Sequence, residues 1–159
     1  MEGSVDRAYL LELLGNLVRT ESPTGGEGEI AAYLAAEMRT AGFAEVDLDP
    51  HHNVVGTVTW GRGGRHLFLM THSDTAPRGP GGGKPAFRIA PGGDFQKRGE
   101  VALGHGVAAP KAAIAAMVTA ARELVRCRAP FGGRLSVAVV TKDLKCNHDG
   151  PKEIADRHL

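Results

Sequence analysis

Apolar residues recur at helical spacing in two segments near the N-terminus. The first segment, residues 6–19, carries most of its large apolar side chains on one face, and the second runs to about residue 41 with an apolar residue at every fourth position. The residues that define the two faces are Leu10, Leu14, Leu17 and Val18, followed by Ile30, Leu34 and Met38. Both segments are therefore predicted to be amphipathic helices that pack against a core.

The residues between these helices are polar and rich in glycine. Thr24 and Glu27 have the spacing of a capping box, in which two side chains bond N–H groups at the start of a helix. Gly42 follows the second helix, and glycine commonly ends a helix because it adopts the left-handed conformation easily. We therefore expect the second helix to begin at this capping box and to end before Gly42.

Four segments have the apolar pattern of strands. Residues 44–48, 53–59 and 134–141 are rich in valine and leucine, and residues 67–70 form a continuous apolar run with turn residues on both sides. Such a run is typical of a strand that is buried on both faces. We predict that residues 66–71 and 134–141 are neighbouring central strands of one sheet.

The rest of the chain completes an α/β layered domain. Residues 78–100 hold seven glycines and three prolines without periodicity, and we expect a loop there. Residues 109–126 predict a helix packed on the sheet, with Pro110 in its first turn, and a short helix is expected from Pro151. No linker divides the sequence, so residues 1–159 are predicted to be one helix-sheet-helix domain.

Charge and composition exclude several classes of function. The formal net charge of +1 gives no electrostatic reason to expect nucleic-acid or membrane-surface binding. No apolar run approaches the roughly 20 residues of a membrane span, and the acidic N-terminus does not resemble a signal peptide. The two cysteines do not suggest a disulfide framework. We therefore expect a soluble cytoplasmic protein.

Candidate chemistry is concentrated where the apolar run ends, in the sequence THSDTAP at residues 71–77. In open α/β sheets, ligand-binding and catalytic groups gather at the carboxyl ends of the strands. A metal-bound imidazole commonly donates its second N–H to a carboxylate, and His72 and Asp74 have the spacing for such a pair. An isolated pair of this kind is also compatible with a purely structural polar contact.

The string HSDTAP resembles the HxDT(V/A)P signature of the co-catalytic zinc hydrolases, which include acetylornithine deacetylase, succinyl-diaminopimelate desuccinylase, glutamate carboxypeptidase and tripeptidase. The turn TESPT at residues 20–24 is similar to a second family feature, and residues 104–116, GHGVAAPKAAIAA, are similar to its GRGxxDxKxxxAA motif. The resemblance covers nearly all of this chain and the N-terminal part of the family's catalytic domain. It implies the fold of a zinc-exopeptidase catalytic domain without the inserted lid domain.

The resemblance also implies roles for particular residues. His72 takes the position of a metal ligand, with Asp74 as the residue that orients it, and Asp143 takes the position of the general base. The implied cofactor is zinc, or cobalt or manganese, and the implied substrates are N-acyl amino acids or small peptides.

Two of the family's metal-ligand positions carry residues without a donor atom, namely Ala109 at the bridging aspartate and Leu144 at a glutamate. The remaining family ligands lie further along than Leu159. We therefore expect a truncated, catalytically impaired hydrolase whose zinc site is weak or absent. We also expect self-association through an uncovered sheet face.

Three alternatives remain open at the level of sequence. The first is a site rebuilt from His72, Cys146 and His148, with His105 at its rim. The second is a non-catalytic, partner-binding domain of the same fold. The third is nucleotide binding through residues 104–109, which match GxGxxA before a helix but lack the acidic residue that the fingerprint needs at the end of the following strand.

Overall fold

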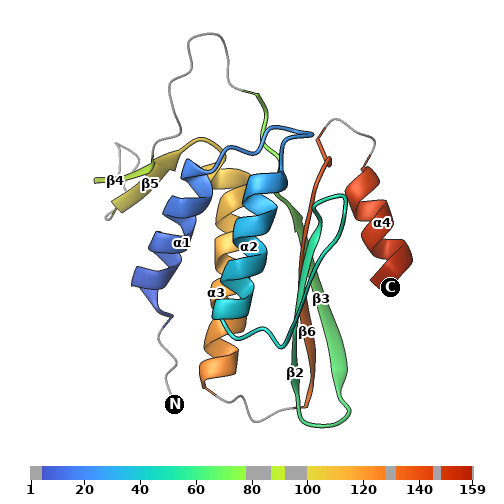
Figure 1. Cartoon of the computed structure of the whole chain (residues 1–159). Coiled ribbons are helices and arrows are strands. Elements are labelled where there is room, and N and C mark those ends of the chain that lie inside the picture. The colour runs from blue at the N-terminus through green and yellow to red at the C-terminus, as the bar shows by residue number, and fades with distance from the viewer. Residues whose placement is uncertain (1–4, 78–86, 92–99, 128–131, 145–147, 159) are drawn as a thin grey trace.

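The structure is a computed structural model of the chain, and it describes residues 5–77, 87–91, 100–127, 132–144 and 148–158 (Figure 1). Four α-helices and six strands make up the described part. In chain order these elements are α1 (Arg7–Arg19), α2 (Gly28–Thr40), β1 (Glu45–Leu48), β2 (Val54–Trp60), β3 (Arg65–His72), β4 (Phe87–Pro91), β5 (Glu100–Gly104), the π-helical turn η1 (Val107–Lys111), α3 (Ala112–Arg126), β6 (Gly133–Val140) and α4 (Asp149–His158). The predicted α/β class is confirmed.

The main sheet has four strands in the order β1-β2-β6-β3. Strands β3 and β6 run parallel with Leu67 opposite Leu135 and His72 opposite Val140, whereas β2 pairs antiparallel with β6 and with β1. The prediction that the third and the last strand are neighbours is confirmed. Because they are parallel, both strands deliver their carboxyl ends to the same edge of the sheet.

The prediction that residues 66–71 form a central strand buried on both faces is wrong. Within the described part of the chain, β3 is the last strand of the sheet and has a partner on one side only. Leu67 and Met70 are 57% and 47% exposed, and only residues such as Leu69 pack against the main core. A continuous apolar run indicates that a segment forms a strand with apolar side chains on both faces. It does not indicate whether the strand has a neighbour on one side or on both.

Helices α1, α2 and α3 lie on one face of the sheet and α4 lies on the other (Figure 1). The larger core fills the space between the three helices and the sheet, and includes Leu17, Ile30, Val54, Val118 and Val137. The smaller core joins α4 to the opposite sheet face. Its buried members are Val55, Ala138, Val140 and Ile154. The predicted helical stripes face this core, except that Leu10 is only partly buried and is not among its members.

Helix α2 ends as the sequence predicts. Gly42 has φ of 93°, its N–H donates to the carbonyl of Arg39, and the N–H of Phe43 donates to the carbonyl of Met38. These two bonds form a Schellman motif, which satisfies carbonyl groups that the helix leaves unpaired. The left-handed conformation explains why a glycine occupies this position.

Three predicted boundaries need correction. Part of the expected loop 78–100 is strand β4, which pairs antiparallel with β5 in a separate two-stranded sheet, while residues 78–86 and 92–99 lie outside the described residues. Helix α3 begins at Ala112, because Ala109 is extended (φ −155°, ψ 130°) and Pro110 belongs to the turn before the helix. Helix α4 begins at Asp149, two residues before the expected Pro151.

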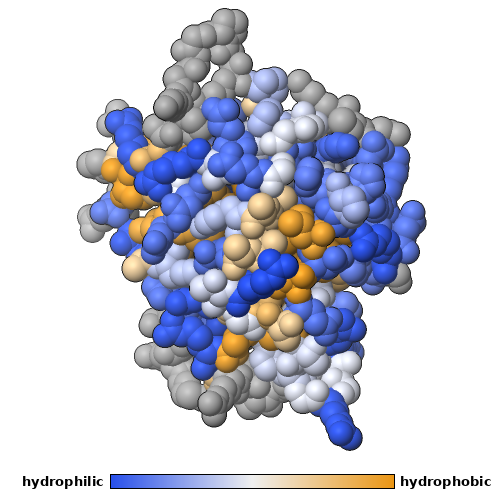
Figure 2. Space-filling view, in the orientation of Figure 1, coloured by the Kyte–Doolittle hydropathy of each residue, from blue (hydrophilic) through white to orange (hydrophobic). Residues whose placement is uncertain are grey.

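The surface seen from the side of Figure 1 is mainly hydrophilic, with apolar residues reaching it beside α2 and near β4 and β5 (Figure 2). None of the helices in the described part of the chain has both the length and the apolar character needed to cross a lipid bilayer.

Candidate functional site at the end of strand β3

His72, the last residue of β3, forms a hydrogen bond with Asp74. The distance between His72 Nδ1 and Asp74 Oδ1 is 2.9 Å, the carboxylate is fully buried, and the imidazole is 21% exposed. This pairing was predicted from the sequence and is confirmed. With Nδ1 facing the carboxylate, Nε2 is the ring nitrogen that His72 has left for a ligand.

Asp74 accepts three further hydrogen bonds from distant parts of the chain. Oδ2 accepts from the Thr24 hydroxyl and from the backbone N–H of Leu144, both over 2.9 Å, and Oδ1 accepts from the backbone N–H of Asp143 over 3.3 Å. Burial by itself raises the pKa of Asp74, but the donors at Leu144, Thr24, His72 and Asp143 outweigh it and hold that pKa below its ordinary value. Asp74 is therefore a fixed anion that joins β3 to the turn after β6.

The predicted capping box between Thr24 and Glu27 is wrong. Helix α2 has no side-chain cap, since Thr24 donates to Asp74 instead and Oε1 of Glu27 accepts from the backbone N–H of Lys142 over 2.9 Å. Glu27 is 1% exposed. Both side chains therefore bind the end of the sheet. The sequence offered one sign of this arrangement, because the TESPT turn belongs to the motifs that carry the resemblance.

Backbone hydrogen bonds secure the segment that follows β3. The N–H of Ser73 donates to the carbonyl of Val140, and the N–H of Thr75 donates to the carbonyl of Ser22, each over 2.8 Å. The first bond extends the pairing of β3 with β6, and the second joins residue 75 to the turn after α1. Asp74 thus lies between two anchored neighbours, so its carboxylate has little freedom to move.

Asp143 contacts the His72–Asp74 pair through its backbone N–H, which donates to Asp74. The side chain of Asp143 instead forms a hydrogen bond with His148. The distance between Asp143 Oδ1 and His148 Nδ1 is 2.8 Å, and the His148 side chain is 67% exposed. Lys142 and His148 both have positive φ, at 53° and 59°, which is unusual for residues other than glycine. The turn is therefore held in a conformation that the bonds from residues 142–144 to Glu27 and Asp74 help to maintain.

Residues 105–111 flank the site on another side. Nε2 of His105 lies 2.9 Å from the carbonyl oxygen of Ala76, and the ammonium of the buried Lys111 donates to the carbonyl of Thr20 over 2.7 Å. Gly106 has φ of 73°, and a Cβ there would lie 2.7 Å from Cγ2 of Thr75. A glycine is thus required for this close approach. The predicted proximity of Ala109 to His72 stays a prediction.

The residues present do not fit a two-ion zinc centre. Zinc takes about four donor atoms, and a two-metal site needs a carboxylate shared between the ions. His72 offers one nitrogen, whereas the side chains of Ala109 and Leu144 offer no donor. Among the described residues, no group of three or more His, Cys, Asp or Glu side chains is arranged to hold a metal ion. Cys146, one member of the alternative rebuilt site, lies outside the described residues.

The nucleotide-binding alternative is not supported by the topology. The dinucleotide fingerprint belongs to a βαβ unit in which the strand before the glycines and the strand after the helix lie in one parallel sheet. Here the preceding strand, β5, pairs only with β4 in the described structure, and the following strand, β6, belongs to the main sheet. Gly106 serves the packing beside Thr75 instead.

Comparison with known proteins confirms the resemblance that the motifs predicted. The chain is 32% identical over 155 residues to succinyl-diaminopimelate desuccinylase of Xanthomonas oryzae pv. oryzae, an alignment covering 94% of this chain and 39% of that enzyme. The desuccinylase of Stenotrophomonas maltophilia is 30% identical over 151 residues, covering 92% of this chain and 38% of the enzyme. The chain thus spans about two fifths of the length of these relatives. No protein-family model matches the chain.

Solved structures confirm the fold. The aminopeptidase PepT of Bacillus cereus superimposes with a TM-score of 0.71 at 21% identity, covering 89% of this chain and 38% of the peptidase. A dinuclear metal-binding peptidase of the M20 family from Bacillus subtilis superimposes with a TM-score of 0.63 at 14% identity, covering 95% of this chain and 40% of that protein. The described elements are thus arranged as in the catalytic domains of M20 peptidases.

Proposed function

We propose that His72 and Asp74 form one corner of an amide-hydrolase site, and that these 159 residues by themselves are catalytically impaired. The observation that carries the proposal is the 2.9 Å bond between the imidazole and a fully buried carboxylate at the carboxyl end of β3. A carboxylate that fixes the Nδ1 tautomer prepares Nε2 as a ligand atom. The proposed substrates are N-acyl amino acids, of which the succinylated substrates of the desuccinylase relatives are one kind, or small peptides.

In this proposal each of the two aspartates of the site has a defined role. Asp74 orients His72 and holds the turn at residues 143 and 144 through two backbone N–H groups. Asp143 is the proposed proton acceptor for an attacking water, with Oδ1 bonded to His148 and Oδ2 facing no partner among the described residues. General bases of this kind act within hydrogen-bonding distance of the water that they deprotonate.

The proposed impairment follows from two other positions. Ala109 stands where the family carries the bridging aspartate, and Leu144 stands where it carries a glutamate, so neither supplies an oxygen. A zinc, cobalt or manganese ion bound through His72 alone would lack most of its ligands. Ala109 and Leu144 are also compatible with the alternative, a non-catalytic domain of the same fold. A measurement of metal binding distinguishes the two, because only the proposed site binds a metal ion through His72.

The experiment measures metal content and hydrolysis with the chain as it stands. We expect weak zinc, cobalt or manganese binding that His72→Ala removes and that His51→Ala, a change at an exposed histidine of a loop, leaves intact. We expect no chelator-sensitive release of succinate or acetate from N-acyl amino acids. Tight binding of two ions together with turnover would refute the proposed impairment, whereas binding unaffected by His72→Ala would refute the proposed site.

A further inference from the structure

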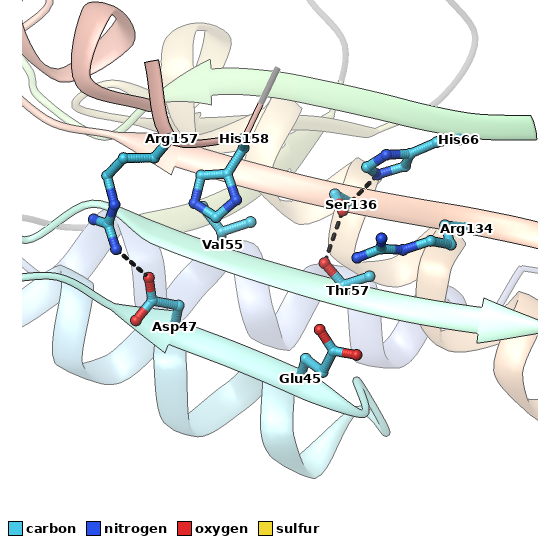
Figure 3. Close-up of a pocket in the computed structure, with 9 residues that line it drawn as sticks. All are labelled: Glu45, Asp47, Val55, Thr57, His66, Arg134, Ser136, Arg157 and His158. Atoms are coloured by element: carbon cyan, nitrogen blue, oxygen red, sulfur yellow. Dashed lines mark hydrogen bonds and ion pairs between the residues drawn. The ribbon is translucent and has the colours of Figure 1, made fainter. Parts of the chain in front are cut away.

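A cavity lies at the end of β3 opposite to His72, on the face of the sheet that α4 partly covers. Its volume is about 290 Å³, and it is open to solvent and lined by residues of β1, β2, β6 and the start of β3, with the end of α4 at one side (Figure 3). Pockets for small molecules usually measure about 300–1,000 Å³, so this cavity suits a ligand of a few heavy atoms.

The cavity occupies the polar half of a sheet face whose other half is apolar. Toward the carboxyl end of β6, this face presents Val55, Ala138 and Val140, which pack with Ile154 of α4. Toward the other end, the residues that point to the same side are Glu45 on β1, Thr57 on β2, Arg134 and Ser136 on β6, and His66 on β3. Helix α4 therefore covers the apolar half and leaves the polar half open to a ligand.

Two buried hydroxyl groups form the floor of this cavity. Ser136 and Thr57 are 2% and 5% exposed, their oxygens lie 2.7 Å apart, and Nε2 of His66 lies 2.9 Å from the oxygen of Ser136. Each hydroxyl has one proton to donate, and the imidazole has a proton on one nitrogen or the other. If Nε2 of His66 donates to Ser136, the Ser136 hydroxyl donates to Thr57 and the proton of the Thr57 hydroxyl has no acceptor among the three. If Nε2 accepts from Ser136, the Thr57 hydroxyl donates to Ser136 and the Nδ1–H of His66 has no acceptor among the three. With either direction of these hydrogen bonds, the three side chains together keep one N–H or O–H group that can donate to a ligand.

One cation and one anion at this cavity have no partner among the described residues. Within the described part of the chain, the side chains of Arg134 and Glu45 form no hydrogen bond or ion pair. The guanidinium of Arg157, in contrast, is bound to Asp47 over 3.0 Å and to Asp49 over 3.1 Å. Glu45 lies directly opposite Thr57 in the register of β1 and β2. A guanidinium and a carboxylate are thus placed on the two flanks of a hydroxyl-lined floor (Figure 3).

We propose that this cavity binds a small zwitterion such as an α-amino acid. The carboxylate of the ligand would bind the guanidinium of Arg134 and the spare donor of the hydroxyl chain, and its ammonium group would bind Glu45. Hydrogen bonds that involve charged groups are the stronger ones, and a planar guanidinium matches a carboxylate well. A simple anion would face repulsion from Glu45, and a simple cation would face repulsion from Arg134, so a ligand with both charges fits best.

The test is a titration followed by two-dimensional ¹H–¹⁵N spectra at constant ionic strength, with L-alanine and 4-aminobutyrate as probes. We expect saturable shifts at the amides of residues 57, 66 and 136 with at least one probe, at a dissociation constant on the order of millimolar, because so few atoms make contact. Acetate and methylamine, which each carry one of the two charges, should bind at least ten times more weakly.

Matched variants assign the binding to this cavity. Arg134→Gln and Glu45→Gln should each weaken the better probe at least tenfold, while Arg88→Gln and Glu29→Gln, which remove the same charges from exposed positions on β4 and α2, should not. Thr57→Val tests the hydroxyl chain without a large change of volume. Shifts that do not saturate, equal binding of acetate, or equal effects of the matched control variants would overturn the proposal.

Discussion

The hydroxyl of Thr24 donates to Oδ2 of Asp74 over 2.9 Å, although 50 residues separate the two in the chain. This bond ties the turn before α2 to the residue that orients His72. Asp74 has no exposed surface, so each donor that reaches its carboxylate replaces water that burial has removed. The geometry of the proposed site therefore depends on residues outside the His-x-Asp motif itself.

Replacing Thr24 by valine should raise the pKa of Asp74 toward its ordinary value and destabilise the fold. The change keeps the shape of the side chain but removes one donor from a buried anion, which typically costs about 1–3 kcal/mol. Chemical denaturation measures the loss, and carbon-detected NMR titration of the carboxyl group measures the pKa. Thr59→Val, at an exposed threonine of β2, is the control and should change neither; an unchanged pKa in Thr24→Val would contradict the proposed role.

Asp74 should make the stability of the chain depend on pH in the acidic range. Its pKa is lower in the folded chain than the ordinary value of 3.8, so its contribution is present above that value and is lost as the pH falls through the folded pKa. Asp74→Asn should accordingly be less stable than the unchanged chain at pH 7, and the difference should shrink as the pH is lowered below about 4. Urea unfolding at several pH values tests this, and a difference that stays constant would contradict it.

The double change Ala109→Asp with Leu144→Glu should not produce a working hydrolase from this chain. It returns two carboxylates, but the family takes further ligands from other positions, and Asp143 is one methylene shorter than the usual base. A shift of about 1 Å in a positioned group can cost about 100-fold in rate. The measurement is hydrolysis of N-acetyl and N-succinyl amino acids with added zinc, cobalt or manganese. Turnover that a chelator removes and His72→Ala abolishes would contradict the prediction.

Gly150→Ala should displace helix α4 and destabilise the chain. A Cβ at this position would overlap the carbonyl oxygen of Thr141 and lie 2.9 Å from Oδ1 of Asn53, and the first of these is backbone that has little room to move. Gly28→Ala is the matched control, because a Cβ there meets only the side chain of His52 at 3.4 Å. Thermal unfolding should show a lower midpoint for the first variant only, and equal midpoints would show that α4 adjusts freely.

The edge of β3 that has no partner among the described strands should let two copies of this chain associate. Unpaired strand edges present N–H and C=O groups that a second strand can pair with, and Leu67 at 57% exposure adds apolar surface. Leu67→Lys should therefore lower the average mass measured by light scattering at high concentration, whereas Leu103→Lys, at a partly exposed leucine of β5, should not. A monomeric unchanged chain at every concentration would contradict this expectation.

Local patterns in the sequence determined the helices, most strands and the central pair of the site. The helix that became α3 and the end of α2 at Gly42 follow from periodicity and turn residues that act over short distances. The sequence also predicted that β3 and β6 are neighbours, but their parallel direction and register appear only in the structure. The His72–Asp74 bond was predictable because the two residues are separated by one at the end of a strand, and because HSDTAP resembles a family signature that contains such a pair.

Tertiary structure decided which partners Thr24 and Glu27 take and where β3 lies in the sheet. Their spacing matches a capping box, but the hydroxyl of Thr24 binds the buried carboxylate of Asp74, and the carboxylate of Glu27 binds the partly buried N–H of Lys142. A buried charge costs more free energy to leave unpaired than the first N–H groups of a helix that water can reach. Likewise, an apolar run predicts that a segment is a strand but not how many strands pair with it. The edge position of β3 among the described strands is therefore visible only in the folded structure. Long-range contacts of this kind depend on the arrangement of several elements at once, which no local pattern contains.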